Sequence, residues 1–158
     1  MSLELLPLVW LVWRWTRKLL LWGFIATVAV TVLYRFVPVP VTPLMLIRVQ
    51  EHWDKGEDGR LTKTWVELEN VSPHVVKAVI ASEDQKFVDH HGFDWDQIWS
   101  ALTSEHAHRG ASTLSQQTAK NLYLWPSRSW VRKGLEVYFT GLIELTWSKR
   151  RILEVYLN

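Results

Sequence analysis

The chain has 158 residues, of which 48% are hydrophobic and 22% are charged, and it contains 11 tryptophans and no cysteine. At about 100–200 residues per domain, this length leaves room for one domain and excludes a multidomain enzyme. The lack of cysteine excludes a disulfide framework, a thiol nucleophile and a cysteine-bound zinc or iron–sulfur site. Tryptophan is enriched at membrane interfaces and in ligand grooves, so its abundance indicates contact with a bilayer.

The net charge of +2 is the sum of three unlike segments. Residues 1–36 carry a net charge of +3, residues 37–108 carry −6 and residues 109–158 carry +5. An acidic middle beside a basic final third indicates a carboxylate-driven step next to an anionic ligand. Solvated helix faces explain the same charges equally well, so charge alone does not decide between a functional site and an ordinary solvent-exposed surface.

A stretch of 16 residues without charge, residues 19–34, predicts a membrane-spanning helix. It would be about 24 Å long at ~1.5 Å per residue, and flanking Lys18 and Arg35 can extend their charged ends beyond a ~30 Å hydrocarbon core. Arg14, Arg17 and Lys18 precede the span, which predicts a cytoplasmic N-terminus. A cleaved signal peptide is the alternative, but small residues suited to cleavage do not follow the apolar run.

We therefore expect four segments in chain order. Residues 1–18 form a cytoplasmic and interfacial N-terminus, residues 19–36 an uncleaved transmembrane anchor, and residues 37–44 a stiff stalk with three prolines. Residues 45–158 form an exported globular domain.

Helical signals dominate this last segment and predict an all-α fold. Helices are expected over residues 45–53, 75–81, 95–102, 114–124, 129–145 and 149–157, most of them opened by a serine, threonine or aspartate cap. Residues 62–68 alternate with period two and predict an extended piece. Within residues 129–145, an apolar stripe predicts one buried helix face, formed by Val131, Leu135, Tyr138, Leu142 and Leu145.

Two adjacent carboxylates, Glu83 and Asp84, follow an apolar helix face. At the edge of a core Glu83 is the better candidate for a general base. Asp84 points about 100° away on a helix and is expected to hold a loop by accepting backbone donors. A frayed helix end is the alternative for this segment. His90 and His91 lack a partner at zinc-site spacing, which disfavours a metal site.

Polar residues in two later helices indicate an anion site. A helix capped by Ser112 or Thr113 presents free backbone donors, and Thr113, Gln117 and Lys120 would share one face of it. Arg132, Glu136, Thr140 and Glu144 recur every four residues opposite the apolar stripe. Salt bridges worth roughly 0.3–0.5 kcal/mol are the alternative there, although arginine before glutamate is the weaker orientation for such a pair.

Four ordered segments over residues 83–158 resemble the peptidoglycan glycosyltransferases of family 51, most closely their monofunctional, membrane-anchored members. The first segment matches through Glu83, Asp84, Phe87, His90, Gly92 and Asp94. The others match through Gly110–Asn121, through Arg132, Lys133 and Glu136, and through Lys149–Asn158.

The resemblance implies a lysozyme-like helical domain that polymerises lipid II into β-1,4-linked glycan strands, with inversion and release of undecaprenyl pyrophosphate. Glu83 matches the catalytic base. Glu136 matches a second essential carboxylate that orients the site, either directly or through Mg or Mn at the pyrophosphate, and no other cofactor is implied. Positions that match substrate contacts are Asp84, Phe87, Thr113, Gln117, Lys120 and Arg132.

The implied location is the outer, periplasmic face of the bacterial cytoplasmic (inner) membrane, in a single-pass protein. The implied partners are lipid II, the growing glycan strand, membrane lipid and other cell-wall synthesis and division proteins, with no nucleic acid. Because the family continues beyond its fourth motif, the domain is expected to be incomplete and residues 1–158 alone to polymerise weakly or not at all. Two alternatives are a non-catalytic membrane partner of the synthesis machinery and a lysozyme-like hydrolase.

Overall fold

The computed structural model describes residues 6–103 and 112–158, and these are helical with no strand among them. The elements in chain order are α1 (Leu6–Tyr34), α2 (Pro43–Asp54), the short 3-10 helix η1 (Leu68–Asn70), α3 (Pro73–Glu83), α4 (Trp95–Thr103), α5 (Leu114–Tyr123), α6 (Trp130–Thr146) and α7 (Lys149–Leu157). The all-α prediction is confirmed. Residues 62–68 form no ladder within the described chain, although the Asn158 side chain bonds both backbone groups of Val66.

Local capping signals explain where these helices begin. Ser72 caps α3 with Pro73 in its first turn, and Ser129 and Ser148 cap α6 and α7. Thr113 caps α5 in a reciprocal capping box with Gln116. Each side chain satisfies backbone N–H groups that have no partner inside the helix.

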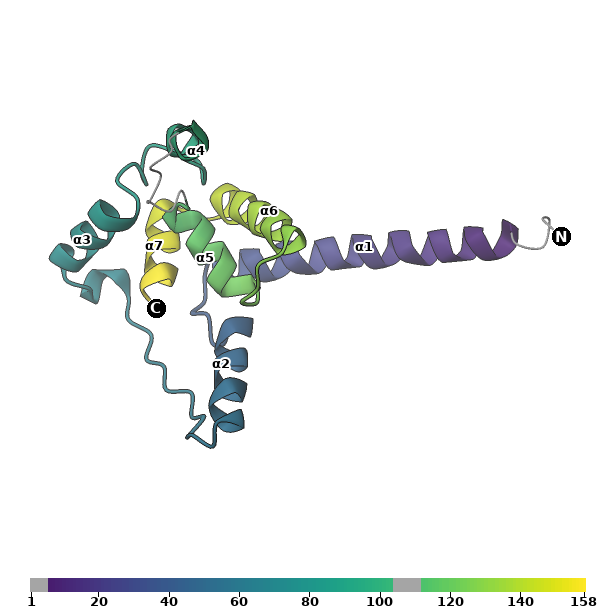
Figure 1. The fold of residues 1–158 in the computed structure, drawn as a ribbon, viewed down its shortest axis with the longest axis horizontal. Helices are drawn as coiled ribbons and strands as arrows, with labels where there is room; N and C mark the ends of the chain where they lie inside the picture. Colours follow the sequence, from purple (N-terminus) through teal and green to yellow (C-terminus); the bar gives the residue numbers. More distant parts are fainter. Residues whose placement is uncertain (1–5, 104–111) are drawn as a thin grey trace.

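The core lies where α5, α6 and α7 pack together, with α2 and α3 at its flanks (Figure 1). Leu114, Ile143 and Ile152, one from each of the three helices, are fully buried there. The rings of Tyr123 and Phe139 stack with centroids 4.3 Å apart, which fixes α5 against α6.

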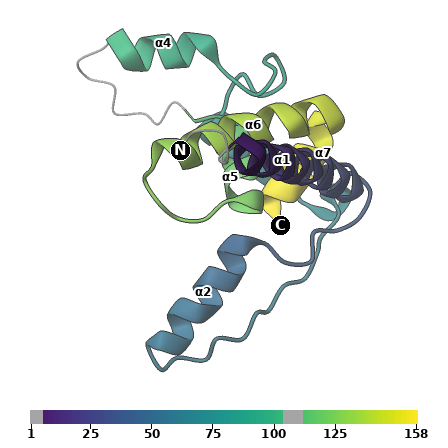
Figure 2. The same cartoon turned by 90° about the vertical axis from the view of Figure 1, so that its right-hand side faces the viewer.

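Helix α1 extends from this bundle as a long rod (Figures 1 and 2). Its segment Val9–Tyr34 is long and apolar enough to cross a bilayer. Its C-terminal part contacts the domain: Thr27 Oγ1 lies 2.8 Å from Tyr138 Oη, and Trp147 Nε1 donates to the Thr31 carbonyl at 2.8 Å. The anchor and the domain are thus packed against each other.

The proline-rich link after α1 also lies against the domain. Val39 is 2% exposed, and the Lys63 ammonium donates to its carbonyl at 2.8 Å. The Arg151 guanidinium donates to the carbonyls of Tyr34 and Val37, which satisfies the C-terminal end of α1. The link is extended, as its prolines predict, but it does not act as a free spacer.

The predicted buried face of α6 is correct for Leu135, Tyr138 and Leu142, which pack against the core, and wrong at its two ends. Val131 and Leu145 are 71% and 87% exposed, whereas Glu136 and Thr140 are buried together with Phe139 and Ile143. The polar stripe, formed by Arg132, Glu136, Thr140 and Glu144, faces α5 and α7. These helices supply partners for its charged and hydroxyl groups. Leu135, Tyr138 and Leu142 of the apolar stripe are partly buried against the core, and Tyr138 also contacts α1.

Candidate active site

Glu83 is the last residue of α3 and is exposed. Its carboxylate accepts a hydrogen bond of 3.0 Å from Gln117 Nε2 on α5. The burial expected for this side chain is therefore not observed, because α3 ends at the surface of the bundle. An exposed carboxylate that is held by one amide can still accept a proton from a bound hydroxyl.

Asp84 has the structural role that its position predicts. Its carboxylate is 2% exposed, accepts the Leu114 backbone N–H at 3.0 Å, and lies 3.0 Å from His90 Nε2 through both oxygens. His90 Nδ1 accepts the Gly92 N–H at 3.1 Å, so the imidazole proton lies on Nε2 and points at Asp84. The two side chains fix the loop after α3 to the start of α5.

Phe87 and Thr113 are buried with Asp84, at 1% and 3% exposure. The Thr113 hydroxyl accepts from Gln116 N–H and donates to the Gly92 carbonyl at 2.7 Å. Phe87 packs beneath the Lys149 ammonium, which lies 4.7 Å from its ring centroid. These three residues, which the resemblance matches to substrate contacts, are almost fully buried, and each also holds the framework around Glu83.

Glu136 is 3% exposed and forms ion pairs with two cations on its own helix, Arg132 at 2.9 Å and Lys133 at 2.5 Å. The intrahelical salt bridge that is the alternative for this stripe is thus formed. Arg132 Nε is buried and has no hydrogen-bond partner among the described residues. The pair turns Arg132 toward α5 and holds its guanidinium in place.

Arg132 also lines a groove of about 500 Å³ between α2, α5 and the start of α6. Three more cations line it, Arg48, Lys120 and Arg128, and the described residues that line it include no carboxylate. Sequence reasoning identified Lys120 and Arg132 but missed Arg48 and Arg128, which lie outside the four matched segments. Such a groove favours an anion with several charges.

Helix α5 joins the carboxylate to this groove. Gln117, which holds Glu83, and Lys120, which lines the groove, are one helical turn apart, about 4.5 Å along the axis. The structure therefore places Glu83 beside Gln117, and it places Lys120 and Arg132 in the same groove.

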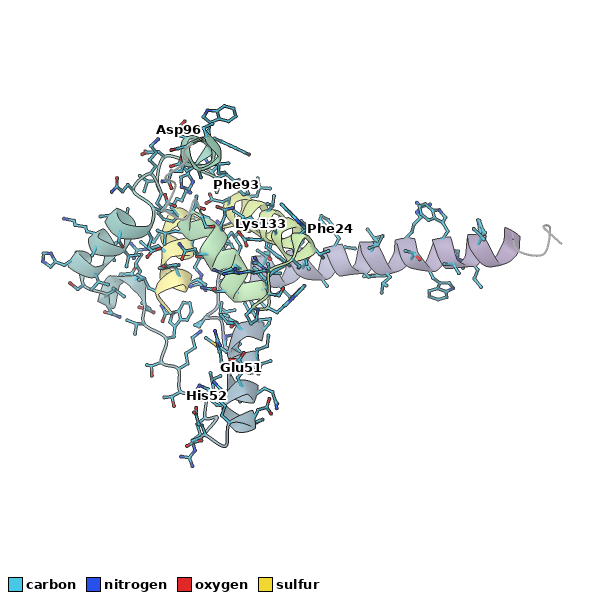
Figure 3. The ribbon with its side chains drawn as sticks, in the orientation of Figure 1. Phe24, Glu51, His52, Phe93, Asp96 and Lys133 are labelled. Atoms are coloured by element: carbon cyan, nitrogen blue, oxygen red, sulfur yellow. The ribbon has the colours of Figure 1, made fainter. Side chains whose placement is uncertain are left out.

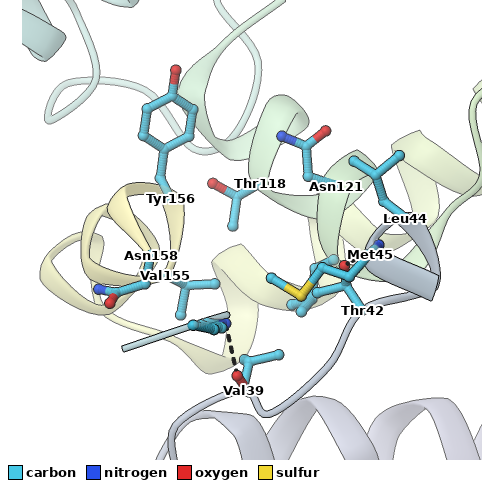
Figure 4. Close-up of a pocket in the computed structure, with 11 residues that line it drawn as sticks. Val39, Thr42, Leu44, Met45, Thr118, Asn121, Val155, Tyr156 and Asn158 are labelled. Atoms are coloured by element: carbon cyan, nitrogen blue, oxygen red, sulfur yellow. Dashed lines mark hydrogen bonds between the residues drawn. The ribbon is translucent and has the colours of Figure 1, made fainter. Parts of the chain in front are cut away.

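Tyr156 on α7 is a further residue of the site that sequence reasoning did not single out. Its hydroxyl lies 3.4 Å from Gln117 Oε1, and burial together with the negative charge of Glu83 raises its pKa. Its ring borders a second cavity, of about 210 Å³, and its hydroxyl points away from that cavity (Figure 4). The only sequence signal was its place in the fourth matched segment.

The described residues contain no group of three or more histidine or acidic side chains that could hold a metal ion. Gly110, which opens the second matched segment, lies outside the described residues.

Comparison with known proteins places these features in a family. The transglycosylase family model matches residues 51–158. Proteins named biosynthetic peptidoglycan transglycosylase from Bacteroides thetaiotaomicron and Bdellovibrio bacteriovorus are both 53% identical over 92% of this chain, which covers 60% and 59% of their lengths. One from Rhodospirillum centenum is 55% identical over 83% of this chain, which covers 56% of its length.

The chain thus spans about 60% of the length of the curated relatives it matches. The family model covers more than half of the chain, and it includes α3 through α7 with Glu83, Lys120, Arg132 and Glu136. On this evidence the chain belongs to the transglycosylase family.

Proposed function

We propose that this protein polymerises peptidoglycan glycan strands from lipid II by inverting glycosyl transfer. The observation that carries the proposal is the arrangement along α5. Gln117 holds the exposed Glu83 carboxylate, and Lys120, one helical turn further on, lines the groove with three other cations. The names of the relatives, which describe biosynthetic peptidoglycan transglycosylases, support the same reaction class.

In the proposed reaction Glu83 acts as general base. Its carboxylate accepts the proton of the 4-hydroxyl of the acceptor sugar while that oxygen attacks C1 of the donor muramyl residue. The bond between C1 and the pyrophosphate oxygen breaks with its electron pair, so undecaprenyl pyrophosphate leaves and the new bond is β-1,4. Gln117 donates to Glu83 and keeps the carboxylate oriented.

Lys120 and Arg132, with Arg48 and Arg128, would bind the leaving pyrophosphate in the groove. Fixed cations stabilise the negative charge that grows on the leaving group in the transition state. Glu136 would act through Arg132, because its carboxylate already pairs with that guanidinium and with Lys133. A hydrolase of finished glycan releases no pyrophosphate and has no use for such a groove.

A divalent cation at the pyrophosphate finds few protein ligands here. The described groove residues offer nitrogen cations rather than carboxylates, and Glu136 is occupied by its two ion pairs. Hard divalent cations prefer oxygen ligands, so the described residues do not fit a resident Mg or Mn. The proposed steps accordingly use the protein's own cations.

For location we propose a single-pass protein of the cytoplasmic membrane, with the N-terminus in the cytoplasm and the domain on the outer face. Helix α1 and the cluster of Arg14, Arg17 and Lys18 before its uncharged part support this orientation. Lipid II and the growing strand are the proposed substrates, and contacts with other cell-wall synthesis and division proteins would follow from the same location.

Because residues 1–158 alone are expected to polymerise weakly or not at all, the reaction class is tested on a complete chain that contains them, offered lipid II with a fluorescent stem peptide and, separately, finished peptidoglycan. We expect a ladder of glycan strands from lipid II, with one undecaprenyl pyrophosphate released per bond formed. Muropeptides released from finished peptidoglycan without strand synthesis would support the hydrolase instead. No turnover of either substrate by the protein, together with retained capture of other cell-wall proteins, would support the non-catalytic partner.

A further inference from the structure

The side-chain amide of Gln117 is held at both its nitrogen and its oxygen. Its Nε2 donates to the Glu83 carboxylate at 3.0 Å and to the Ser112 carbonyl at 3.4 Å. Because a carboxylate only accepts hydrogen bonds, the amide nitrogen faces Glu83 and the amide oxygen faces away from it. That oxygen, Oε1, lies 3.4 Å from the Tyr156 hydroxyl, which is therefore the donor. The hydrogen bonds thus run in one direction, from Tyr156 through Gln117 to Glu83.

The two parts of the Tyr156 side chain have different surroundings. Its ring borders the cavity of about 210 Å³, and its hydroxyl points away from that cavity (Figure 4). Burial, and next the negative charge of Glu83, raise the pKa of Tyr156 above its ordinary value near 10, so the hydroxyl keeps its proton at neutral pH and remains a donor. The role of the hydroxyl can therefore be separated from the packing of the ring.

Helix α7, which carries Tyr156, is fixed along its whole length. It packs along α5, and side chains of the two helices lie between them (Figure 3). Near its start the Lys149 ammonium pairs with a carboxylate of α6 at 2.8 Å, and the Arg151 guanidinium donates to the last carbonyl of α1 at 2.8 Å. After its last residue, the Asn158 side chain bonds both backbone groups of Val66. These contacts hold the Tyr156 hydroxyl in one place opposite α5.

The exposed Glu83 carboxylate depends on Gln117 for its orientation. Among the described residues, Gln117 supplies the side-chain hydrogen bond that Glu83 accepts. Turning the amide by half a turn exchanges Oε1 and Nε2 and sets an oxygen against the carboxylate, where two acceptors repel each other. The Tyr156 hydroxyl opposes this turn, because it donates to Oε1 and offers its proton on that side alone.

We propose that Tyr156 is a positioning residue for strand synthesis: its hydroxyl fixes the amide of Gln117, which in turn holds the Glu83 carboxylate ready to accept the proton of the attacking hydroxyl. The proposal rests on the proposed function, in which Glu83 is the base. Tyr156 is not among the described residues that line the cationic groove. Its effect therefore falls on the rate of transfer and passes through Gln117, rather than on the binding of the pyrophosphate.

The test introduces Tyr156→Phe into a complete chain that contains residues 1–158 and measures lipid II polymerisation. This change removes the hydroxyl and keeps the ring. We expect kcat to fall about 3- to 10-fold, which corresponds to one hydrogen bond between neutral groups, while KM for lipid II and the thermal midpoint stay unchanged. Tyr123→Phe is the matched control. It removes a hydroxyl that donates to Thr31 of α1, away from Glu83, and should keep the wild-type kcat.

A double-mutant cycle with Gln117→Ala tests whether Tyr156 acts through the amide. Gln117→Ala removes the group that the Tyr156 hydroxyl holds, so adding Tyr156→Phe to it should lower kcat no further. Two residues that act independently would instead multiply their effects. A merely structural role of Tyr156 would give the same loss in both backgrounds, together with a lower thermal midpoint.

An unchanged kcat in Tyr156→Phe would overturn the proposal, and so would a loss that persists in full beside Gln117→Ala. A raised KM at unchanged kcat would also overturn it, because Tyr156 would then contact lipid II. These results leave the proposed function in place. Glu83→Gln, measured in the same assay, tests that function separately: strand synthesis at close to the wild-type rate would overturn the base and, with it, the positioning role of Tyr156.

Discussion

The turn at Gly92 connects the loop after Glu83 to the start of α5. Its N–H donates to His90, and its carbonyl accepts from Thr113. Its φ of +88° lies in the left-handed region, and a Cβ there would meet Thr140 Cγ2 at 2.9 Å and Glu144 Cγ at 3.0 Å. Both backbone conformation and space therefore require glycine.

We predict that Gly92→Ala destabilises the protein by about 2–3 kcal/mol, from backbone strain plus the clash with α6. Gly56→Ala is the matched control, because Gly56 has a φ of +74° but a Cβ added there would meet no atom within 4 Å. It should cost about 1 kcal/mol, from backbone strain alone. Thermal unfolding of the two variants in the same detergent compares these effects, and equal shifts in midpoint would contradict the predicted clash.

Among single residues, the roles that depend on neighbours in sequence could be predicted. Asp84 is expected to accept backbone donors because it points away from Glu83 on a helix, and it accepts the Leu114 N–H. The place of Tyr156 near Glu83 could not be predicted, because it depends on how α7 packs beside α5. The exposure of Glu83 depends in the same way on where α3 lies.

At the level of helices, one buried carboxylate joins three elements. Glu144 on α6 accepts from the Ser115 hydroxyl on α5 and from the Lys149 ammonium of α7 at 2.8 Å, and its side chain is 7% exposed. Its Cγ also packs beside Gly92. This junction sets the position of the α5 terminus that precedes Gln117.

We predict that Lys149→Met lowers stability by about 2–4 kcal/mol, because it leaves the Glu144 carboxylate buried without a counter-charge. The double variant Glu144→Gln with Lys149→Met should recover most of that loss. Arg150→Met, on the same helix as Lys149, is the control: it removes an exposed ion pair with Glu69 of η1 and should cost no more than about 1 kcal/mol. A double variant as unstable as Lys149→Met would show that the charge balance is not the cause.

The contact between α5 and α1 predicts a loss of stability at high pH. Burial raises the pKa of Tyr123 to about 12, while its hydroxyl donates to Thr31. An unfolded tyrosine titrates near pH 10, so the unfolded chain releases this proton first. The free energy of unfolding should therefore fall between about pH 10 and pH 12.

Tyr123→Phe should make this pH dependence shallower, without removing it, because burial and the charge of Glu83 also raise the pKa of Tyr156. Chemical unfolding at pH 9, 10 and 11 measures the slope for both proteins. A variant whose slope equals that of the wild type would contradict the assignment to Tyr123.

The starts of α3, α5 and α7 could be predicted from sequence, whereas the start of α1 at Leu6, well before the predicted residue 19, and the full extent of the buried face of α6 could not. Caps such as Ser72, Thr113 and Ser148 act on backbone groups a few residues away, so their signal is local. Periodicity shows that α6 has an apolar and a polar face but not which one meets the bundle. That choice depends on Ser115 and Lys149, which lie on other helices.

For the whole molecule, the sequence predicts an anchor and a helical domain but not their mutual packing. The contacts that join them link residues far apart in the chain, such as Thr27 with Tyr138 and Tyr34 with Arg151. A stalk of three prolines suggests separation, but buried Val39 holds the link to the domain. The cationic groove likewise combines residues from α2, α5 and α6.

These features make the anchor part of the domain's architecture rather than a tether. The four-cation groove lies between α2, α5 and the start of α6, and α6 is also the helix that contacts α1. Gln117, which holds the proposed base Glu83, lies one helical turn from the groove residue Lys120 along α5.

The central claim, that Glu83 is the base for strand synthesis, is tested by Glu83→Gln in a complete chain that contains residues 1–158, using the lipid II polymerisation assay. Loss of the base should slow strand formation by about 100-fold or more, with the thermal midpoint unchanged. Glu67→Gln, an exposed glutamate outside the site with no side-chain cap bond, should retain full activity. A Glu83→Gln protein that forms strands at close to the wild-type rate would contradict the account.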